Sequence, residues 1–236
     1  MALFSADADY RAFAGIMTET LVKIPLRICA FCIMPNHWHF VVWPKTSNEL
    51  ADFFQRLSVT HATRFQHFNQ RVGAGHVYQG RFKAFPIERD DHFYQVVRYV
   101  ERNPLRAHLV NNAEAWRWSS LWLRNQSSTM QQTMLSDWPV SLPENWIELV
   151  NRPQNEAELE SVRRCVRKGA PLGGREWTAA TAKTFGLEST LRPRGRPRKF
   201  KGKETGPGAI AKPSDPDAAA PSVNRLDLND DTQITK

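Results

Sequence analysis

Two pairs of side chains in this chain have the types and the spacing for metal-assisted chemistry. His37 and His39 flank a tryptophan inside an apolar run, and side chains two apart on a strand point to the same face. Neutral imidazoles bind divalent cations through a ring nitrogen. Tyr99 and Asn103 lie four apart in a segment of helical periodicity, so they share one helix face. They are a candidate nucleophile and a candidate third metal ligand.

Each of these residues also has an ordinary structural explanation. A histidine on an apolar strand is often a core or surface residue, and a tyrosine beside a buried helix face usually packs with its hydroxyl in water. The combination favours a functional site, because Asn103 lies one helical turn from a hydroxyl that could attack a phosphorus centre. Arg98, Arg102 and Arg106 lie nearby in sequence and are candidates for holding phosphates.

The elements that must position these pairs follow from the apolar pattern. Residues 28–34 and 37–43 are apolar runs separated by the turn-forming dipeptide Pro-Asn, so we expect a hairpin or a bulged strand entry. Residues 90–103 show apolar side chains at helical spacing behind two aspartates. Pro104 disfavours helical geometry at the residue before it, so this helix is expected to end near Asn103.

The segment between the two pairs is expected to form a helix and then a strand. Residues 47–70 carry a second helical pattern, and His61 falls on its apolar stripe, where core packing is favoured over metal ligation. Residues 78–87 indicate a loop and a strand. Two basic side chains there, Arg81 and Lys83, fit either a solvated edge or contact with a DNA backbone.

Several segments together carry a resemblance to a known family. They are Cys32-Ile-Met-Pro-Asn-His-Trp-His-Phe-Val-Val42, Tyr78-Gln-Gly-Arg-Phe-Lys83, Arg98-Tyr-Val-Glu-Arg-Asn-Pro-Leu-Arg-Ala107 and Trp118-Ser-Ser120. In this order, and over roughly residues 5–125, they resemble the single-tyrosine HUH transposases, specifically the REP-associated tyrosine transposases and their relatives. The resemblance is specific because several motifs recur in the right order.

The resemblance implies roles for the candidate residues. His37 and His39 would be the two HUH histidines, and Tyr99 would be the nucleophile. Asn103 stands where the family's helix supplies a third ligand, and asparagine there resembles the REP-associated branch, since many insertion-sequence relatives have glutamine. The implied cofactor is Mg²⁺ or Mn²⁺. The implied reaction is cleavage and rejoining of single-stranded DNA, at a hairpin or palindromic repeat, through a 5′-phosphotyrosine.

The order of the expected elements predicts an α+β fold. A helix, a strand pair, a helix, a strand and a helix suggest an antiparallel sheet with helices on one face, which resembles the ferredoxin-like core of the family. Relatives carry a further N-terminal segment that forms the first strand, and this chain opens past it. A sheet without that strand exposes unpaired backbone groups. We therefore expect a truncated copy or a misassigned start codon.

The composition fits an enzyme that acts on nucleic acid. The net charge of +8 and the isoelectric point near 9.7 favour a polyanionic partner, although a merely basic soluble protein has the same balance. Three cysteines, an odd number, indicate a reducing compartment. Neither a signal peptide nor a long apolar run occurs, so we expect no membrane partner and a cytoplasmic, nucleoid-associated protein.

A structural zinc site is an alternative for the histidine pair. Cys29 and Cys32, followed by His37 and His39, would supply four suitable ligands. Residues three apart on a strand face opposite sides of the sheet, however, and the expected strand contains both cysteines. The sequence therefore disfavours zinc.

The chain is expected to divide into four parts. These are a catalytic domain at 1–125, a connector at 126–155, a small helical and DNA-binding unit at 156–190, and a basic arm with a disordered tail at 191–236. The arm resembles an AT-hook, with Arg194, Arg196 and Arg198 placed to contact duplex DNA. A generic basic tail is the alternative, and it too would bind DNA.

Two other function classes remain open at this point. The first is a non-catalytic DNA-binding protein, a decayed or domesticated transposase that binds through its basic C-terminal arm. The second is a metalloenzyme with a substrate other than DNA, which leaves the charge and the arm unexplained. The sequence leaves open the DNA site, the choice between monomer and homodimer, and the choice between Mg²⁺ and Mn²⁺.

Overall fold

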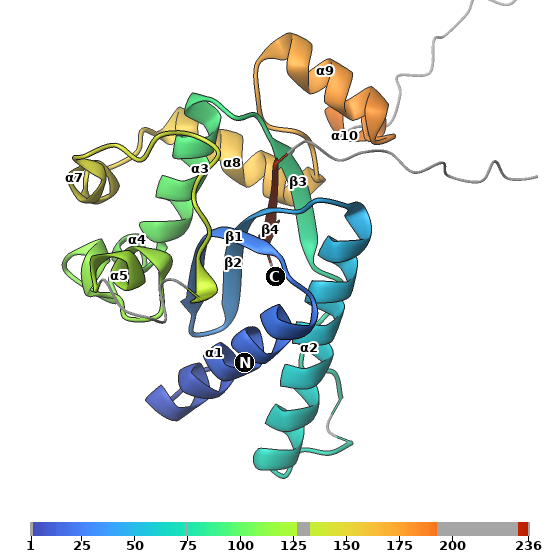
Figure 1. The fold of residues 1–236 in the computed structure, drawn as a ribbon, viewed down its shortest axis with the longest axis vertical. Coiled ribbons are helices and arrows are strands. Elements are labelled where there is room, and N and C mark those ends of the chain that lie inside the picture. Colours follow the sequence, from blue (N-terminus) through green and yellow to red (C-terminus); the bar gives the residue numbers. More distant parts are fainter. Residues whose placement is uncertain (1, 74, 127–132, 193–230, 236) are drawn as a thin grey trace, which may run out of the picture.

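A four-stranded antiparallel sheet forms the centre of the computed structural model, which describes residues 2–73, 75–126, 133–192 and 231–235 (Figure 1). The strand order is β1-β2-β4-β3. The strands are β1 (Arg27–Met34), β2 (His37–Trp43), β3 (Lys83–Ile87) and β4 (Asp231–Thr235). The α+β class expected from the sequence is confirmed.

The first two strands form the expected hairpin. Met34 pairs with His37 across the Pro-Asn turn, and Arg27 pairs with Trp43 at the open end. The register shifts between Ile28 and Ala30. This irregularity matters because it places Cys29 in the same core cluster as Cys32, so the alternation that assigned the two cysteines to opposite faces does not hold.

Helices cover both faces of the sheet, whereas the sequence predicted helices on one face. Every residue of β1 after Arg27 is buried, because the run is apolar at each position and both faces need cover. One face packs on α1 (Asp7–Lys23) and α2 (Ser47–Phe68) (Figure 1). The other packs on α3 (Asp91–Glu101), α7 (Trp146–Asn151) and α8 (Glu156–Lys168).

The third helix is built as its sequence pattern predicts. Asp90 caps it by accepting a hydrogen bond of 2.8 Å from the backbone N–H of His92. Its apolar stripe, Phe93, Val96, Val97 and Val100, is buried against the sheet. Pro104 has no N–H to continue the helical ladder, so α3 ends at Glu101 and a short helix, α4 (Asn103–Arg106), follows at once.

The remaining elements are short and lie after the third helix. They are the 3₁₀ turn η1 (Ala113–Ala115), α5 (Ser120–Asn125), α9 (Arg175–Thr184) and α10 (Glu188–Leu191). Helix α8 packs on α3 and β3, so the C-terminal helical segment adjoins the sheet domain. None of the helices in the described ranges is both long and apolar enough to cross a bilayer.

A strand from the far end of the chain lies inside the sheet. β4 pairs antiparallel with β2 on one side and with β3 on the other. Thr235 lies opposite His39 of β2 and opposite Lys83 of β3. Residues 231–235 thus differ from the expected disordered tail, because β2 and β3 each present backbone groups that an extended segment can satisfy. Arg194, Arg196 and Arg198 of the expected arm lie outside the described residues.

His61 packs in the core as the sequence predicted. It is 4% exposed, its ring stacks on Phe4, and its Nδ1 accepts a hydrogen bond of 2.6 Å from the Tyr78 hydroxyl. That hydroxyl in turn accepts from the indole N–H of Trp38 at 3.3 Å. Burial lowers the pKa of His61 to about 4.

The buried His61 predicts a loss of stability in acid. The unfolded chain binds a proton on this ring below a pH of about 6.5, whereas the folded chain does so only near its depressed pKa of about 4. The neutral His61 ring therefore contributes its full share to the free energy of unfolding above pH 6.5. As the pH falls from 6.5 to 4, the free energy of unfolding decreases by about 3 kcal/mol. Urea unfolding between pH 7 and pH 4 should show a shallower pH dependence for His61→Gln than for the wild type; equal slopes would contradict it.

Candidate active site

The two histidines of β2 face each other on the side of the sheet that carries α3. Their Nε2 atoms lie 3.1 Å apart, and His39 is 3% exposed. His37 Nδ1 lies 2.6 Å from the Asn36 side-chain oxygen. Because an amide oxygen can only accept, Nδ1 carries the proton and Nε2 presents its lone pair toward His39. The hairpin thus fixes one ligand atom of His37 as well as its ring.

Both imidazoles are held neutral by their surroundings. Burial lowers the pKa of His37, and it lowers the pKa of His39 much further, with the neighbouring His37 adding to the effect. The Arg106 guanidinium lowers the pKa of both rings as well. A neutral imidazole is the form that ligates a metal, so neither ring has to lose a proton before it binds an ion near neutral pH.

Tyr99 comes from α3 and lies against this pair. Its ring centroid is 5.9 Å from that of His39, the two planes are nearly perpendicular at 82°, and the tyrosine is 8% exposed. Asn103, one turn later, is also buried, and its side-chain oxygen accepts a hydrogen bond of 2.8 Å from Arg106. The Arg106 guanidinium carbon lies 4.2 Å from the centre of the Tyr99 ring. The structure therefore brings the predicted nucleophile to the histidine pair, and Arg106 links it to Asn103.

The other predicted phosphate-binding residues are placed differently. Arg98 donates to the Arg152 carbonyl at 3.1 Å, and Arg102 donates to the carbonyls at the end of α7, Val150 at 3.2 Å and Asn151 at 2.5 Å. These two guanidinium groups hold α7 against α3. Two further basic residues are exposed at the start of β3 or just before it, Arg81 and Lys83.

Comparison with known proteins finds one matching family. Residues 2–103 match the family described as transposase IS200-like, a segment that runs from before α1 to the buried amide of Asn103. The match supports the IS200-like transposase family for this part of the chain. The family supports a transposase-like function, and it implies DNA as the partner. No curated protein and no solved structure matches the chain.

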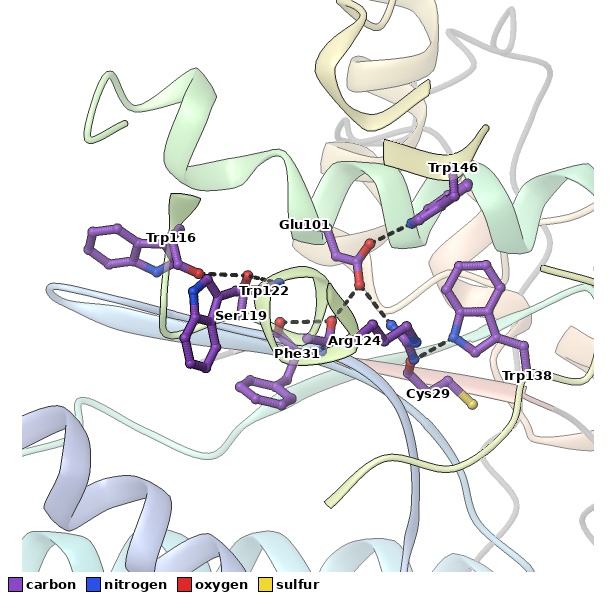
Figure 2. Close-up of polar contacts among 10 residues, drawn as sticks. Cys29, Phe31, Glu101, Trp116, Ser119, Trp122, Arg124, Trp138 and Trp146 are labelled. Carbon is purple, nitrogen blue, oxygen red and sulfur yellow. Dashed lines mark hydrogen bonds and ion pairs between the residues drawn. The ribbon is translucent and has the colours of Figure 1, made fainter. Parts of the chain in front are cut away.

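The matched segment also contains a buried carboxylate that the sequence did not single out. Glu101 is 0% exposed and is the last residue of the tyrosine helix (Figure 2). Its carboxylate accepts from the Ser120 hydroxyl at 2.5 Å, the Arg124 guanidinium at 3.0 Å and the Trp146 indole at 2.7 Å. Burial raises the pKa of Glu101, and Arg124 and the other donors offset part of that shift.

This network ties the tyrosine helix to segments on both sides of it in sequence. Arg124 also donates to the Cys29 carbonyl of β1, as does the Trp138 indole at 2.8 Å (Figure 2). The Ser120 hydroxyl oxygen also accepts from the Phe31 backbone N–H at 3.0 Å, so the Ser-Ser motif connects β1 to α3. The signal in the sequence was the position of Glu101, four residues after the buried Val97, where a charge requires partners.

Replacing Glu101 with alanine should be strongly destabilising. The change leaves the largely buried Arg124 without its counter-charge, which typically costs about 3–5 kcal/mol. Urea denaturation should show this loss in the free energy of unfolding. The double variant Glu101→Leu with Arg124→Met removes both charges and should be more stable than Glu101→Ala. A single variant as stable as the wild type would show that the network does not hold α3.

A second group of possible metal ligands lies at the other end of the tyrosine helix. One oxygen each of Glu88 and Asp90 and one ring nitrogen of His92 lie within 4.8 Å of one another, a group that the sequence did not single out. Asp90 and His92 form the helix cap, and Glu88 accepts from the backbone N–H of Gly174 at 2.6 Å. Among the described residues, Cys29 and Cys32 form no such group with the histidine pair.

Proposed function

We propose that the IS200-like domain is a metal-dependent endonuclease and strand transferase on single-stranded DNA, with Tyr99 as its nucleophile. The observation that carries this proposal is the perpendicular contact between the Tyr99 and His39 rings at 5.9 Å. It places a phenol beside two neutral imidazoles that face each other. The transposase family supplies the substrate class, which is DNA.

The donor set fits a hard or borderline divalent cation. Two ligand atoms in neighbouring positions of an octahedral ion lie about 3 Å apart when the bonds are about 2.1 Å long. The Nε2 atoms of His37 and His39 are 3.1 Å apart, which suits such an ion. Asn103 would add an amide oxygen, the ligand type that favours Mg²⁺ or Mn²⁺ over zinc. Such an ion would polarise the scissile phosphate and orient it.

The protein's own residues then account for bond exchange. The Tyr99 oxygen would attack the phosphorus, lose its proton to solvent, and form a 5′-phosphotyrosine while the bond to the 3′ oxygen breaks. The departing 3′ oxygen takes up a proton and becomes a free hydroxyl. Because the phosphodiester energy is retained in the protein link, attack by another 3′ hydroxyl rejoins the strand without a nucleotide cofactor.

The finer assignment within the family rests on Asn103 and on the shared motifs. Asparagine at this position supports the REP-associated branch, and with it a hairpin or palindromic repeat as the DNA substrate. Arg81 and Lys83 are exposed and are proposed to contact the DNA backbone. The basic arm with Arg194, Arg196 and Arg198 is proposed to add affinity for duplex DNA.

The experiment that tests this function detects covalent attachment. Hairpin oligonucleotides with randomised single-stranded flanks are incubated with the full chain and Mn²⁺, then separated on a denaturing gel. A fluorophore at the 3′ end should migrate with the protein, and one at the 5′ end should leave on the released fragment. Chelation of the ion with EDTA should prevent both. Binding without any attachment would overturn the proposal in favour of a non-catalytic DNA-binding protein.

A further inference from the structure

We propose that Arg106 is a catalytic residue that binds the scissile phosphate beside Tyr99, and that it is the only one of the three neighbouring arginines to do so. This inference rests on the proposed cleavage reaction and goes beyond it by naming the group that contacts the substrate anion. Sequence spacing alone could not separate Arg106 from Arg98 and Arg102, since all three lie close to Tyr99 in the chain.

The helix geometry places Arg106 on the same face as the proposed nucleophile. Asn103 follows Tyr99 by four residues and Arg106 follows it by seven, a spacing that forms one stripe along a helix. The stripe continues across the short break at Pro104, where Arg106 N–H still bonds to the Arg102 carbonyl at 2.9 Å. The side chains meet accordingly, with the guanidinium carbon 4.2 Å from the centre of the Tyr99 ring.

Of the two terminal nitrogens of Arg106, one forms a hydrogen bond within the described residues and the other forms none. Nη2 donates to the Asn103 side-chain oxygen at 2.8 Å. Nη1 is buried and has no hydrogen-bond partner among the residues that the structure describes. A buried N–H without a partner costs free energy, and such groups are rare in native proteins. An oxygen atom of a bound molecule would satisfy this donor.

The charge of Arg106 points to the same kind of ligand. No carboxylate within the described part of the chain forms an ion pair with Arg106, although its side chain is only partly exposed. The residues it meets are an aromatic ring and an amide, Tyr99 and Asn103. A partly buried guanidinium without a counter-charge favours an anion, and its planar fork matches the oxygens of a phosphate.

The two neighbouring arginines use their terminal nitrogens to bind backbone carbonyls. Nη2 of Arg98 donates to the Arg152 carbonyl, and Nη1 of Arg102 donates to two carbonyls at the end of α7. Arg98 has an unpartnered Nε, but its terminal nitrogen is bound to the carbonyl of the residue that follows α7. Arg106 alone among the three contacts both the proposed nucleophile and the proposed third ligand.

The chemistry that follows is positioning and charge stabilisation. One nitrogen of Arg106 would keep Asn103 oriented while the other donates to a non-bridging oxygen of the phosphate that Tyr99 attacks. The cation over the ring would also stabilise negative charge as it develops on the phenol oxygen. A lysine has a single ammonium and cannot hold both partners in this planar geometry.

The test compares Arg106→Met and Arg106→Lys with Arg102→Met, the same substitution at an arginine engaged by α7. The first readout is the salt dependence of binding to a hairpin oligonucleotide. Each phosphate contact with single-stranded DNA contributes about 0.7 to the slope of log affinity against log salt. Arg106→Met should lose about that amount, whereas Arg106→Lys and Arg102→Met should keep the wild-type slope.

The second readout is the single-turnover rate of covalent attachment. Arg106→Met should be slower by about 10²–10³-fold, the usual effect of removing one donor to the transition state. Arg106→Lys should be at least about tenfold slower despite its charge, because it lacks the fork. Arg102→Met should attach DNA at nearly the wild-type rate per folded molecule, with folding checked by thermal melting.

The outcomes separate this inference from the proposed function. If the wild type attaches DNA but Arg106→Met shows an unchanged slope and rate, the role of Arg106 is wrong and the cleavage reaction stands. If the wild type attaches no DNA, the cleavage reaction is wrong, and the salt slope still decides whether Arg106 contacts a phosphate. Should Arg106→Met fail to fold, Arg106→Lys decides, since a wild-type rate in that variant overturns the proposal.

Discussion

Replacing Tyr99 with phenylalanine should abolish covalent attachment to single-stranded DNA while leaving DNA affinity within about twofold. The substitution removes one oxygen and keeps the ring that contacts His39 and Arg106. Loss of a covalent nucleophile lowers turnover by about 10⁴-fold or more, since no other group can form the phosphotyrosine. Denaturing gels report the attachment, and fluorescence anisotropy reports the affinity.

The other tyrosines of the chain provide the controls. Tyr94 donates its hydroxyl to the Ser141 carbonyl at 2.6 Å, so Tyr94→Phe should attach DNA as the wild type does. Burial raises the pKa of Tyr10 to about 12, and it also raises the pKa of Tyr78, whose hydroxyl binds His61. These phenols are poor nucleophiles. Retained attachment in Tyr99→Phe would contradict the assignment and make Tyr94 the next candidate.

The parts of the site that depend on local geometry could be predicted from the sequence. Side chains two residues apart on a strand, or four apart on a helix, lie on the same face. The shared faces of His37 with His39 and of Tyr99 with Asn103 therefore follow from spacing alone. The hairpin turn and the end of the tyrosine helix follow from prolines at 35 and 104. These expectations concern residues within one element.

The parts that depend on distant partners could not be predicted. The sequence predicts Arg98 and Arg102 as phosphate ligands because both are basic and lie near Tyr99. Their hydrogen bonds to carbonyls at the end of α7 join residues about fifty positions apart, so they do not follow from the local sequence. Glu101 binds donors from α5 and α7, and its role emerges only when those helices are placed. The pairing of β4 with β2 and β3 likewise joins opposite ends of the chain.

The bulge in β1 shows how one local irregularity changes a conclusion about chemistry. Strict alternation separates Cys29 from Cys32, yet the register shift brings both into one cluster. Among the described residues, the two cysteines form no group of possible ligands with the histidines. Cys32 lies opposite His39, and burial raises the pKa of its thiol well above the usual value, so it stays protonated and cannot ligate readily. The histidine pair, with Asn103 as the third ligand, stays the proposed site of the ion.

Replacing His39 should weaken the binding of the metal ion and, with it, the metal-dependent cleavage of DNA. With one imidazole gone, the ion would keep His37 and Asn103 at most, and Mn²⁺ affinity should fall by about 10²-fold or more. Attachment at a fixed Mn²⁺ concentration should fall by at least the same factor. Calorimetric titration with Mn²⁺ measures the first effect without requiring activity, and His39→Gln, which keeps a polar side chain in the buried position, serves beside His39→Ala in case the latter folds poorly.

The matched control is His92→Ala, which removes a ligand from the Glu88, Asp90 and His92 group. That group lies at the start of α3, and Tyr99 is seven residues further along, about 10 Å away at the rise of a helix. An ion held there would be too far from the Tyr99 phenol to orient a phosphate under attack. His92→Ala should therefore bind Mn²⁺ and attach DNA as the wild type does. If His92→Ala loses Mn²⁺ binding and attachment while His39→Ala keeps both, the catalytic ion lies at the Glu88, Asp90 and His92 group. The proposed geometry of attack is then wrong.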